Sequence, residues 1–434
     1  MAVIGGGVSG LATAFRLGRL GARVTLFETE DFLGGLGTTF PYRGGHLERF
    51  YHCILPDDDA LVRLIHDVGM GDELLWRPTS MGFMYRRRIF PMNTPLDLLR
   101  FSPLSIVDRV RMGMMGLRAR RHGLKPQLDD IPAETWIRRL AGNRAFEILW
   151  KPLLEAKIGD GYSALPALWL SSRMNREKSS SQEVKGCLKR GYRSLIDALE
   201  RALREQGADI RFRTRVEAIE REGERMALKL GDGDRPTFDQ VVSTTPLVHF
   251  QAMTRGLGLD PALASLQLDY QGVICGVFLL EKPLSPYYWM PLVDSGATAQ
   301  GVVEMSNLVP LERSEGRYVT YLLNYTHRSS AMFAMSDDEI LSRYRRDLAE
   351  LFPDAGRGIV DQFVFRAPFV EPMWTVGYRK LLPPNSIIPG RLYLSCTAQV
   401  YPRVNSWNSC CAVVESMLPE IQRAAAAAPA TRSA

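Results

Sequence analysis

Three glycines and one acid near the N-terminus have the spacing that binds a dinucleotide. Gly5, Gly7 and Gly10 follow a short apolar run at residues 1–4, and Glu28 closes a second apolar run. The first glycine permits a tight turn, the second lets a pyrophosphate approach the backbone, and the third lets a helix pack closely on the strand. The helix N-terminus then faces the phosphate charge, and the carboxylate accepts hydrogen bonds from the adenosine ribose. The spacing therefore predicts a strand–turn–helix–strand unit that binds an adenine dinucleotide.

A second glycine pair behind this acid distinguishes NAD from FAD, the two dinucleotides that use such a fingerprint. The acid is followed by TEDFLGGLGTTF, which contains Gly34 and Gly35. Here the chain resembles the flavoprotein superfamily of monoamine oxidase, protoporphyrinogen oxidase and phytoene desaturase, whose signature joins the ribose-binding acid to a glycine pair beside the pyrophosphate. The resemblance implies FAD as the cofactor. It also assigns cofactor contacts to residues that flank the glycines, namely Val8, Ser9, Thr29 and Leu36.

The middle of the chain extends the resemblance. Residues 191–250 predict a helix, a strand, a short β-meander and a closing strand that ends at Thr244. In the family, the residue that matches Val216 meets the adenine through its backbone. We expect Thr244 and Pro246 to lie beside the cofactor as well.

The C-terminal segment resembles the family but departs from it in detail. Residues 391–395 predict a strand, which leads through a loop to a final helix with Asn408 near its start. In relatives this helix points its positive end at the flavin ring, where reduction leaves negative charge. Ser395 and Cys396 replace the usual Gly-Asp pair, so the customary carboxylate contact to the ribitol is absent. Leu36 stands where many relatives have Arg, so a charge contact to the pyrophosphate is either absent or supplied elsewhere.

The predicted fold class is α/β, with a Rossmann-type FAD-binding domain of the glutathione-reductase-like kind and an inserted α+β substrate domain. The flavin motifs lie at both ends and in the middle of the chain, so the FAD-binding domain is expected to be discontinuous. It comprises residues 1–75, 190–250 and 385–425. The substrate or cap domain then comprises residues 76–189 and 251–384. A disordered tail is expected at residues 426–434.

Two histidines and a glutamate follow a glycine pair in YRGGHLERFYHCIL, which suggests a catalytic site at a bend. UDP-galactopyranose mutase has a similar Gly-x-His-Leu run with its histidine against the flavin, and His46 matches that position. We expect His46 to donate a hydrogen bond near flavin N5 or the C4 carbonyl; a structural histidine is the alternative. Glu48 and His52 are further catalytic candidates, although turn residues often only cap a loop.

Basic residues in the first insertion have ordinary explanations. The stretch MYRRRIFPMNTP predicts a hairpin, and its three arginines are expected in a solvated turn rather than in a phosphate clamp. Lys151 and Lys157 match no catalytic motif, so surface or ion-pair roles are expected for both.

Residues 100–123 mix apolar side chains with six arginines and one acid. Such a stretch fits peripheral contact with an anionic membrane, through which a lipophilic substrate enters, as in related desaturases and porphyrinogen oxidases. It equally fits a helix that faces a core, and Gly113 and Gly116 weaken it as a long regular helix.

Composition excludes several other classes of protein. The chain has 434 residues, of which 46% are hydrophobic and 24% charged, as in an ordinary globular enzyme. The net charge of +6 is small for this length, so nucleic acid is not expected as a partner. The six cysteines lack metal-type spacing, so no metal site is expected. No apolar run of about eighteen residues and no signal peptide is found, which predicts a cytoplasmic location. Met1 stands close to Gly5, which leaves open a start further upstream.

These observations predict an FAD-dependent oxidoreductase that removes a hydride from a C–H bond of a small or lipophilic substrate, with the electrons leaving to oxygen or a carrier. Amine, polyprenyl chain, porphyrinogen and sugar all remain open as substrates. The alternative is a sugar-nucleotide mutase-like isomerase without net redox change, which the Gly-x-His-Leu run favours. A third reading is a degenerate flavoprotein that binds a partner or lipid without turnover.

Overall fold

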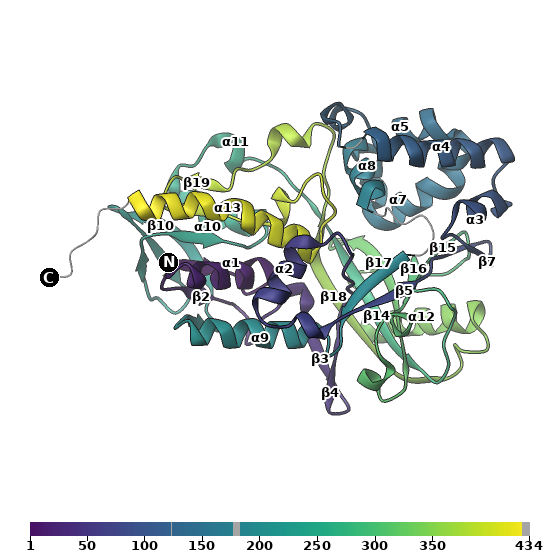
Figure 1. Ribbon diagram of the computed structural model, residues 1–434, viewed down its shortest axis with the longest axis horizontal. Coiled ribbons are helices and arrows are strands. Elements are labelled where there is room, and N and C mark those ends of the chain that lie inside the picture. The colour runs from purple at the N-terminus through teal and green to yellow at the C-terminus, as the bar shows by residue number, and fades with distance from the viewer. Residues whose placement is uncertain (123, 177–182, 428–434) are drawn as a thin grey trace.

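Two large sheets organise the chain, one on each side of the molecule (Figure 1). The computed structural model describes residues 1–122, 124–176 and 183–427. The first sheet has six strands in the order β19-β20-β13-β1-β2-β9, and neighbours are parallel except β19 against β20. Its strands are β1 (Ala2–Ile4), β2 (Thr25–Phe27), β9 (Asp209–Arg211), β13 (Val241–Ser243), β19 (Ser386–Ile388) and β20 (Leu392–Leu394). Segments from both ends and the middle of the chain therefore meet in one sheet.

Both faces of this sheet are covered, which explains why its central strands are apolar throughout. Val3 of β1 packs into a core with the helices on one face, whereas Ala2 and Ile4 pack into a core with a meander on the other. This division follows from the alternation of side chains along a strand. The helices are α1 (Val8–Arg19), α2 (Asp59–Asp67), α9 (Tyr192–Glu205) and α13 (Trp407–Ala427); the other layer holds β10 (Val216–Glu222), β11 (Arg225–Leu230), β12 (Thr237–Phe238), α10 (Leu247–Met253) and α11 (Pro261–Ala264). The predicted α/β class and Rossmann-type arrangement are confirmed.

The second sheet has seven strands in the order β18-β14-β17-β16-β15-β6-β7, antiparallel except for β15 against β6. Alternate residues of β14 divide between its faces. Ile274 packs towards α12 (Asp337–Leu351), while Val273 and Cys275 face a cavity. The strands are β6 (Gly82–Tyr85), β7 (Arg88–Pro91), β14 (Tyr270–Leu280), β15 (Trp289–Val293), β16 (Gly301–Glu304), β17 (Tyr318–His327) and β18 (Ile359–Pro372).

A helical unit from the first insertion lies at the upper right of Figure 1, above the seven-stranded sheet. Trp169 and Phe146 are fully buried in its core. Its helices are α3 (Pro95–Arg100), α4 (Ile106–His122), α5 (Ala133–Ala141), α6 (Asn143–Ala145), α7 (Lys151–Ile158) and α8 (Ala167–Arg176). Two strand pairs complete the fold, β3 (Thr39–Tyr42) with β4 (Gly45–Glu48), and β5 (Leu74–Thr79) with β8 (Glu183–Leu188).

Two smaller predictions concern the first insertion and the C-terminus. The hairpin of β6 and β7 is confirmed, with Arg86 and Arg87 in its turn in the left-handed region, at φ 51° and 63°. Both arginines are exposed and pair with acids at 2.7 and 2.8 Å, which confirms a solvated turn. Of the tail predicted at residues 426–434, residues 428–434 lie outside the described residues, and α13 continues to Ala427.

A substitution of Gly10 tests how closely α1 packs on β1. A Cβ at this position would lie 1.7 Å from the Gly5 carbonyl oxygen, so Gly10→Ala must move backbone. We expect the variant to lower the melting temperature by about 5 °C or more. Gly256→Ala is the matched control, because a Cβ there meets no atom of the described chain within 4 Å. Equal melting temperatures for the two variants would contradict this account of the packing.

Candidate active site

A cavity of about 1650 Å³ runs between the two sheets and up to the helical unit. At one end it is lined by the turn between β1 and α1 and by the end of β2; at the other end it reaches α4, α7 and α8. A cavity of this size accommodates a dinucleotide and a substrate together.

The first turn of α1 faces the cavity with backbone amides whose partial positive charge is not neutralised by a side chain. Gly5 to Ser9 line the wall, α1 has no side-chain N-cap, and no acid lies in its first turn. The Gly34 amide donates to the Gly6 carbonyl at 2.9 Å, so the second glycine pair lies directly against the first. A Cβ on Gly35 would lie only 3.1 Å from the Gly7 Cα, which shows why both segments lack side chains here. Backbone amides without a capping side chain, next to glycines that leave room, can donate hydrogen bonds to a pyrophosphate.

Glu28 lies on the cavity wall where β2 ends. One carboxylate oxygen accepts the Gly6 amide at 2.7 Å, and the other accepts the Glu30 amide at 3.0 Å. These bonds fix the carboxylate beside the glycine turn. A carboxylate at this place suits the ribose hydroxyls of an adenine dinucleotide, so the residues present fit FAD.

Most of the other residues predicted to contact the cofactor also line the cavity. Thr29, Gly34, Gly35, Leu36, Val216, Thr244 and Pro246 are on the wall. The Thr244 hydroxyl donates to the Ile4 carbonyl at 2.8 Å and so secures the turn after β1. Gly10 lies behind the wall, where it supports α1 against the Gly5 carbonyl. Arg215, next to Val216, is a cation on the wall at this end.

Ser395 and Cys396 do not line the cavity, contrary to the expectation from the family pattern. Both are buried, and the Ser395 amide donates to the Ser243 carbonyl at 2.9 Å, which continues the ladder of parallel strands. Thr397 lies on the wall instead. Asn408 lines the cavity, but its amide oxygen accepts the amides of Ala60 and Leu61 at 2.9 and 3.1 Å. Asn408 therefore caps α2 and ties it to the start of α13.

His46 and Glu48 are absent from the cavity wall as well. His46 is exposed beside the turn of the β3–β4 hairpin, which projects from the body at the bottom of Figure 1. Glu48 is buried, accepts the Tyr192 amide at 3.1 Å and forms an ion pair with Arg313 at 2.7 Å. Glu48 therefore has a structural role, since it connects β4 to α9 and to the second insertion.

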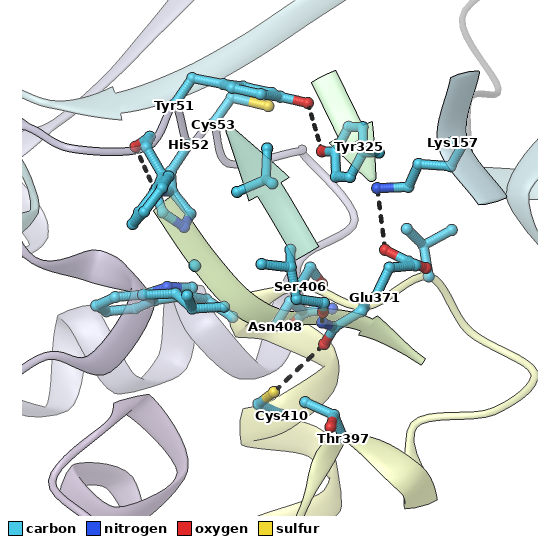
Figure 2. A pocket seen from close by; sticks show the side chains of 18 of the residues that line it. Tyr51, His52, Cys53, Lys157, Tyr325, Glu371, Thr397, Ser406, Asn408 and Cys410 are labelled. Carbon is cyan, nitrogen blue, oxygen red and sulfur yellow. Dashed lines mark hydrogen bonds and ion pairs between the residues drawn. The ribbon is translucent and has the colours of Figure 1, made fainter. Parts of the chain in front are cut away.

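Of the three predicted catalytic candidates, His52 lies on the cavity wall (Figure 2). Its Nδ1 lies 2.9 Å from the Phe50 carbonyl, so Nδ1–H donates and Nε2 remains an acceptor. The imidazole contacts the rings of Tyr192 and Trp407, with centroids 5.2 and 6.0 Å away. Burial lowers the pKa of His52, so the ring is neutral at pH 7.

Figure 2 shows a polar group on the wall that sequence reasoning did not identify. The hydroxyls of Tyr51 and Tyr325 lie 2.9 Å apart, and Lys157 pairs with Glu371 at 3.0 Å. The Lys157 ammonium also lies 3.8 Å from the centre of the Tyr325 ring. The ion-pair role expected for Lys157 is confirmed. The wall towards the helical unit is mainly apolar, with Leu98, Met112, Leu117, Leu149, Leu153 and Met174, and it also carries Arg173 from α8.

Residues 1–122, 124–176 and 183–427 contain no cluster of three or more His, Cys, Asp or Glu that could hold a metal ion. Within the same residues, no helix has both the length and the apolar character needed to cross a membrane.

A bare backbone at the first turn of α1, a carboxylate beside it and an adjoining large cavity are what an FAD-dependent oxidoreductase requires. The chain belongs to the family of flavin containing amine oxidoreductases, which matches residues 8–402. It is 21% identical to coproporphyrinogen III oxidase of Staphylococcus aureus (strain NCTC 8325 / PS 47), over 87% of this chain and 89% of that protein. It is 27% identical to a zeta-carotene desaturase of Zea mays, over 35% of this chain and 31% of that protein.

Among solved structures, reduced UDP-galactopyranose mutase matches with a TM-score of 0.77 and 16% identity, over 96% of this chain and 92% of that chain. This likeness shows the fold alone. The family and the oxidase and desaturase relatives support FAD-dependent oxidation of a C–H bond and do not support the mutase alternative. The predicted superfamily, cofactor and class of enzyme are thus confirmed.

Breaking the buried ion pair between Glu48 and Arg313 tests whether Glu48 has a structural role. Arg313→Met leaves a buried carboxylate without its cation, so we expect it to lower the free energy of unfolding by about 3 kcal/mol. Arg86→Met is the control, because its pair with Asp294 is exposed and contributes about 0–1 kcal/mol. Denaturant titration measures both variants. A fully stable Arg313→Met protein would contradict the structural assignment.

Proposed function

We propose that the enzyme oxidises a large, mainly apolar substrate, held in the part of the cavity that lies between the seven-stranded sheet and the helical unit. The observation that carries this proposal is the continuity of the cavity from the glycine turn to the apolar side chains of α4 and α7. A small amine would leave most of that apolar wall unfilled. The named activity of the Staphylococcus aureus relative, which matches nearly the whole chain, supports a bulky substrate.

The chain's own residues have separable tasks in this proposal. The first turn of α1 and Glu28 hold the dinucleotide, while Val216 and Pro246 shape the cavity at the adenine end. The start of α13 lies on the wall and directs its partial positive charge into the cavity. FAD, when bound, supplies the hydride acceptor. The apolar wall keeps water from the reacting carbon.

His52 replaces His46 in this proposal as the histidine near the reacting groups. It is neutral, its Nδ1–H is held by the Phe50 carbonyl, and Nε2 is available to accept a hydrogen bond. Trp407 and Tyr192, whose own rings are in contact, pack against the imidazole. His52 therefore acts as a positioning acceptor in a preformed pocket.

The flavin test uses purified protein under anaerobic conditions. We expect bound FAD, and we expect coproporphyrinogen III to bleach the visible band of oxidised flavin more strongly than putrescine, because the cavity suits a bulky ring system rather than a short diamine. Val8→Glu places a carboxylate in the first turn of α1 and should weaken FAD retention at least tenfold, whereas the matched Val8→Gln variant retains more FAD. Protein that refuses FAD, or bleaching by putrescine alone, would refute the proposal.

We also propose that α3 and α4 contact an anionic membrane surface. Val110 and its neighbours expose large apolar side chains to solvent, namely Leu96, Leu99, Ile106, Val107, Met114 and Leu117, with exposed fractions of 44% to 72%. Exposed arginines accompany this apolar surface at positions 100, 111 and 118. Such a combination complements anionic lipid headgroups above an apolar interior.

The cavity reaches the same surface. Leu117 is 62% exposed and also lines the cavity, as do Gly113 and Gly116. A Cβ on either glycine would meet no atom of the described chain within 4 Å. An apolar substrate dissolved in a bilayer therefore has a short path from the membrane to the cavity. Gly113 and Gly116, which weaken a regular helix, keep this side of α4 open.

Vesicle flotation tests the membrane contact. We expect the protein to float with phosphatidylglycerol vesicles and not with phosphatidylcholine vesicles, and Val110→Glu to reduce flotation about fivefold. Leu381→Glu is the matched control, because Leu381 is 49% exposed and Val110 is 48% exposed. Light scattering shows whether the surface joins two copies instead. Unchanged flotation of Val110→Glu, or a change of oligomeric state alone, would refute membrane contact.

A further inference from the structure

A buried carboxylate of the helical unit is bonded to the chain segment that precedes α13. Asp129 lies in the short 3₁₀ helix Pro126–Asp130 and is 2% exposed. Its Oδ1 accepts a hydrogen bond from the Tyr401 hydroxyl, and its Oδ2 accepts the Arg379 amide at 3.1 Å. Tyr401 belongs to residues 395–406, which join β20 to α13 and are called the connecting loop below. A single buried acid thus links the helical unit to this loop.

Aromatic rings fix the Tyr401 side chain as well. Its ring lies 5.7 Å from the ring of Trp374 and 5.3 Å from that of Tyr378, between ring centres. Trp374 in turn lies 6.4 Å from Trp169 in the core of the helical unit. The Tyr378 hydroxyl donates to the carbonyl of Ala398, also in the connecting loop, at 3.0 Å. Tyr401 therefore has one orientation, because its ring is packed and its hydroxyl is bonded.

The connecting loop and the start of α13 form one stretch of the cavity wall. Thr397, Ser406 and Asn408 line the cavity there (Figure 2). The Ser409 hydroxyl donates to the Val404 carbonyl at 2.7 Å, so the end of the loop is bonded to the first turn of α13. Asn408 holds the same turn from another side, through its bonds to α2. Loss of the bond at Asp129 should therefore shift the start of α13 without releasing it.

We infer that Asp129 is a positioning residue for flavin reduction, which acts through Tyr401 to hold the positive end of α13 against the flavin ring. This inference rests on the direction of α13 given in the proposed function. A helix N-terminus favours a nearby negative charge by about two- to fivefold in an equilibrium constant, and the effect falls off within one turn. Reduction leaves negative charge on the ring, so a small retreat of α13 disfavours reduction although Asp129 itself is absent from the cavity wall.

The midpoint potential of the bound flavin tests this inference. Asp129→Leu and Tyr401→Phe each remove the bond between the two side chains. In both variants we expect the equilibrium between oxidised and reduced flavin to move about three- to fivefold towards the oxidised form. A threefold change corresponds to a potential about 15 mV more negative for a two-electron couple. Spectroelectrochemical titration of the FAD-loaded protein without substrate measures it, and an unchanged potential in both variants would overturn the inference.

Asp130 offers a matched control, because it is the next acid in the same 3₁₀ helix but pairs with Lys380 at the surface, at 2.9 Å. Asp130→Asn should leave the potential unchanged. Asp129→Asn should shift it less than Asp129→Leu does, since an amide oxygen can still accept the Tyr401 hydroxyl. A shift in Asp130→Asn as large as that in Asp129→Leu would contradict the role of Asp129.

A double variant separates positioning from a general loss of stability. If Asp129 and Tyr401 act through one bond, Asp129→Leu/Tyr401→Phe should shift the potential no further than either single variant. Should Asp129→Leu fail to fold, Tyr401→Phe still provides the test, because it keeps the packed ring. Additive shifts in the double variant, or a lower melting temperature at an unchanged potential, would reduce the bond to a structural one and overturn the inference.

The outcome is distinguishable from failure of the proposed function. Bleaching of the flavin by coproporphyrinogen III, together with an unchanged potential in Asp129→Leu and Tyr401→Phe, would retain the function and reject Asp129 as a positioning residue. A shifted potential in both variants, together with bleaching by putrescine alone, would retain the positioning role and reject the proposed substrate class.

Discussion

The structure depends on the contact between the backbone of Gly10 and the carbonyl of Gly5. With 1.7 Å between that oxygen and any added Cβ, only glycine lets α1 approach β1 so closely. The approach brings the uncapped first turn of α1 to the cavity wall and places the Gly6 amide on Glu28 at 2.7 Å. It also brings the second glycine pair against the first. The arrangement that suits a phosphate and a ribose thus depends on one close contact between backbone atoms.

Sequence reasoning succeeded where the determinants of a site are local. The glycine fingerprint, its acid and the second glycine pair lie within one short stretch, and each residue has its own steric or charge requirement, so spacing alone predicts their arrangement. The hairpin with Arg86 and Arg87 follows the same rule, because its turn and strands are neighbours in sequence. The fold class followed from these local units and from the flavin-like segments that recur along the chain.

Prediction failed where tertiary structure decides. His46 has the right neighbours in sequence, but it lies at the tip of a hairpin that projects from the body, and no local pattern indicates where a hairpin points. Glu371 of β18 was not predicted, because it belongs to no motif and meets its partner Lys157 of α7 only through the fold. Cys396 shows a third case, in which a family position is kept but the side chain turns into the core.

The two ends of the cavity differ in composition, since one is mostly backbone and the other mostly side chains. The end expected to hold the dinucleotide consists of backbone amides, glycines and a single acid, so it places few demands on the other side chains. The substrate end is made of side chains from the seven-stranded sheet and the helical unit, such as Tyr325, Glu371 and Leu117. Substitution there changes the ligand without disturbing the backbone cradle, so fold and cofactor are inherited together while the substrate follows from individual side chains.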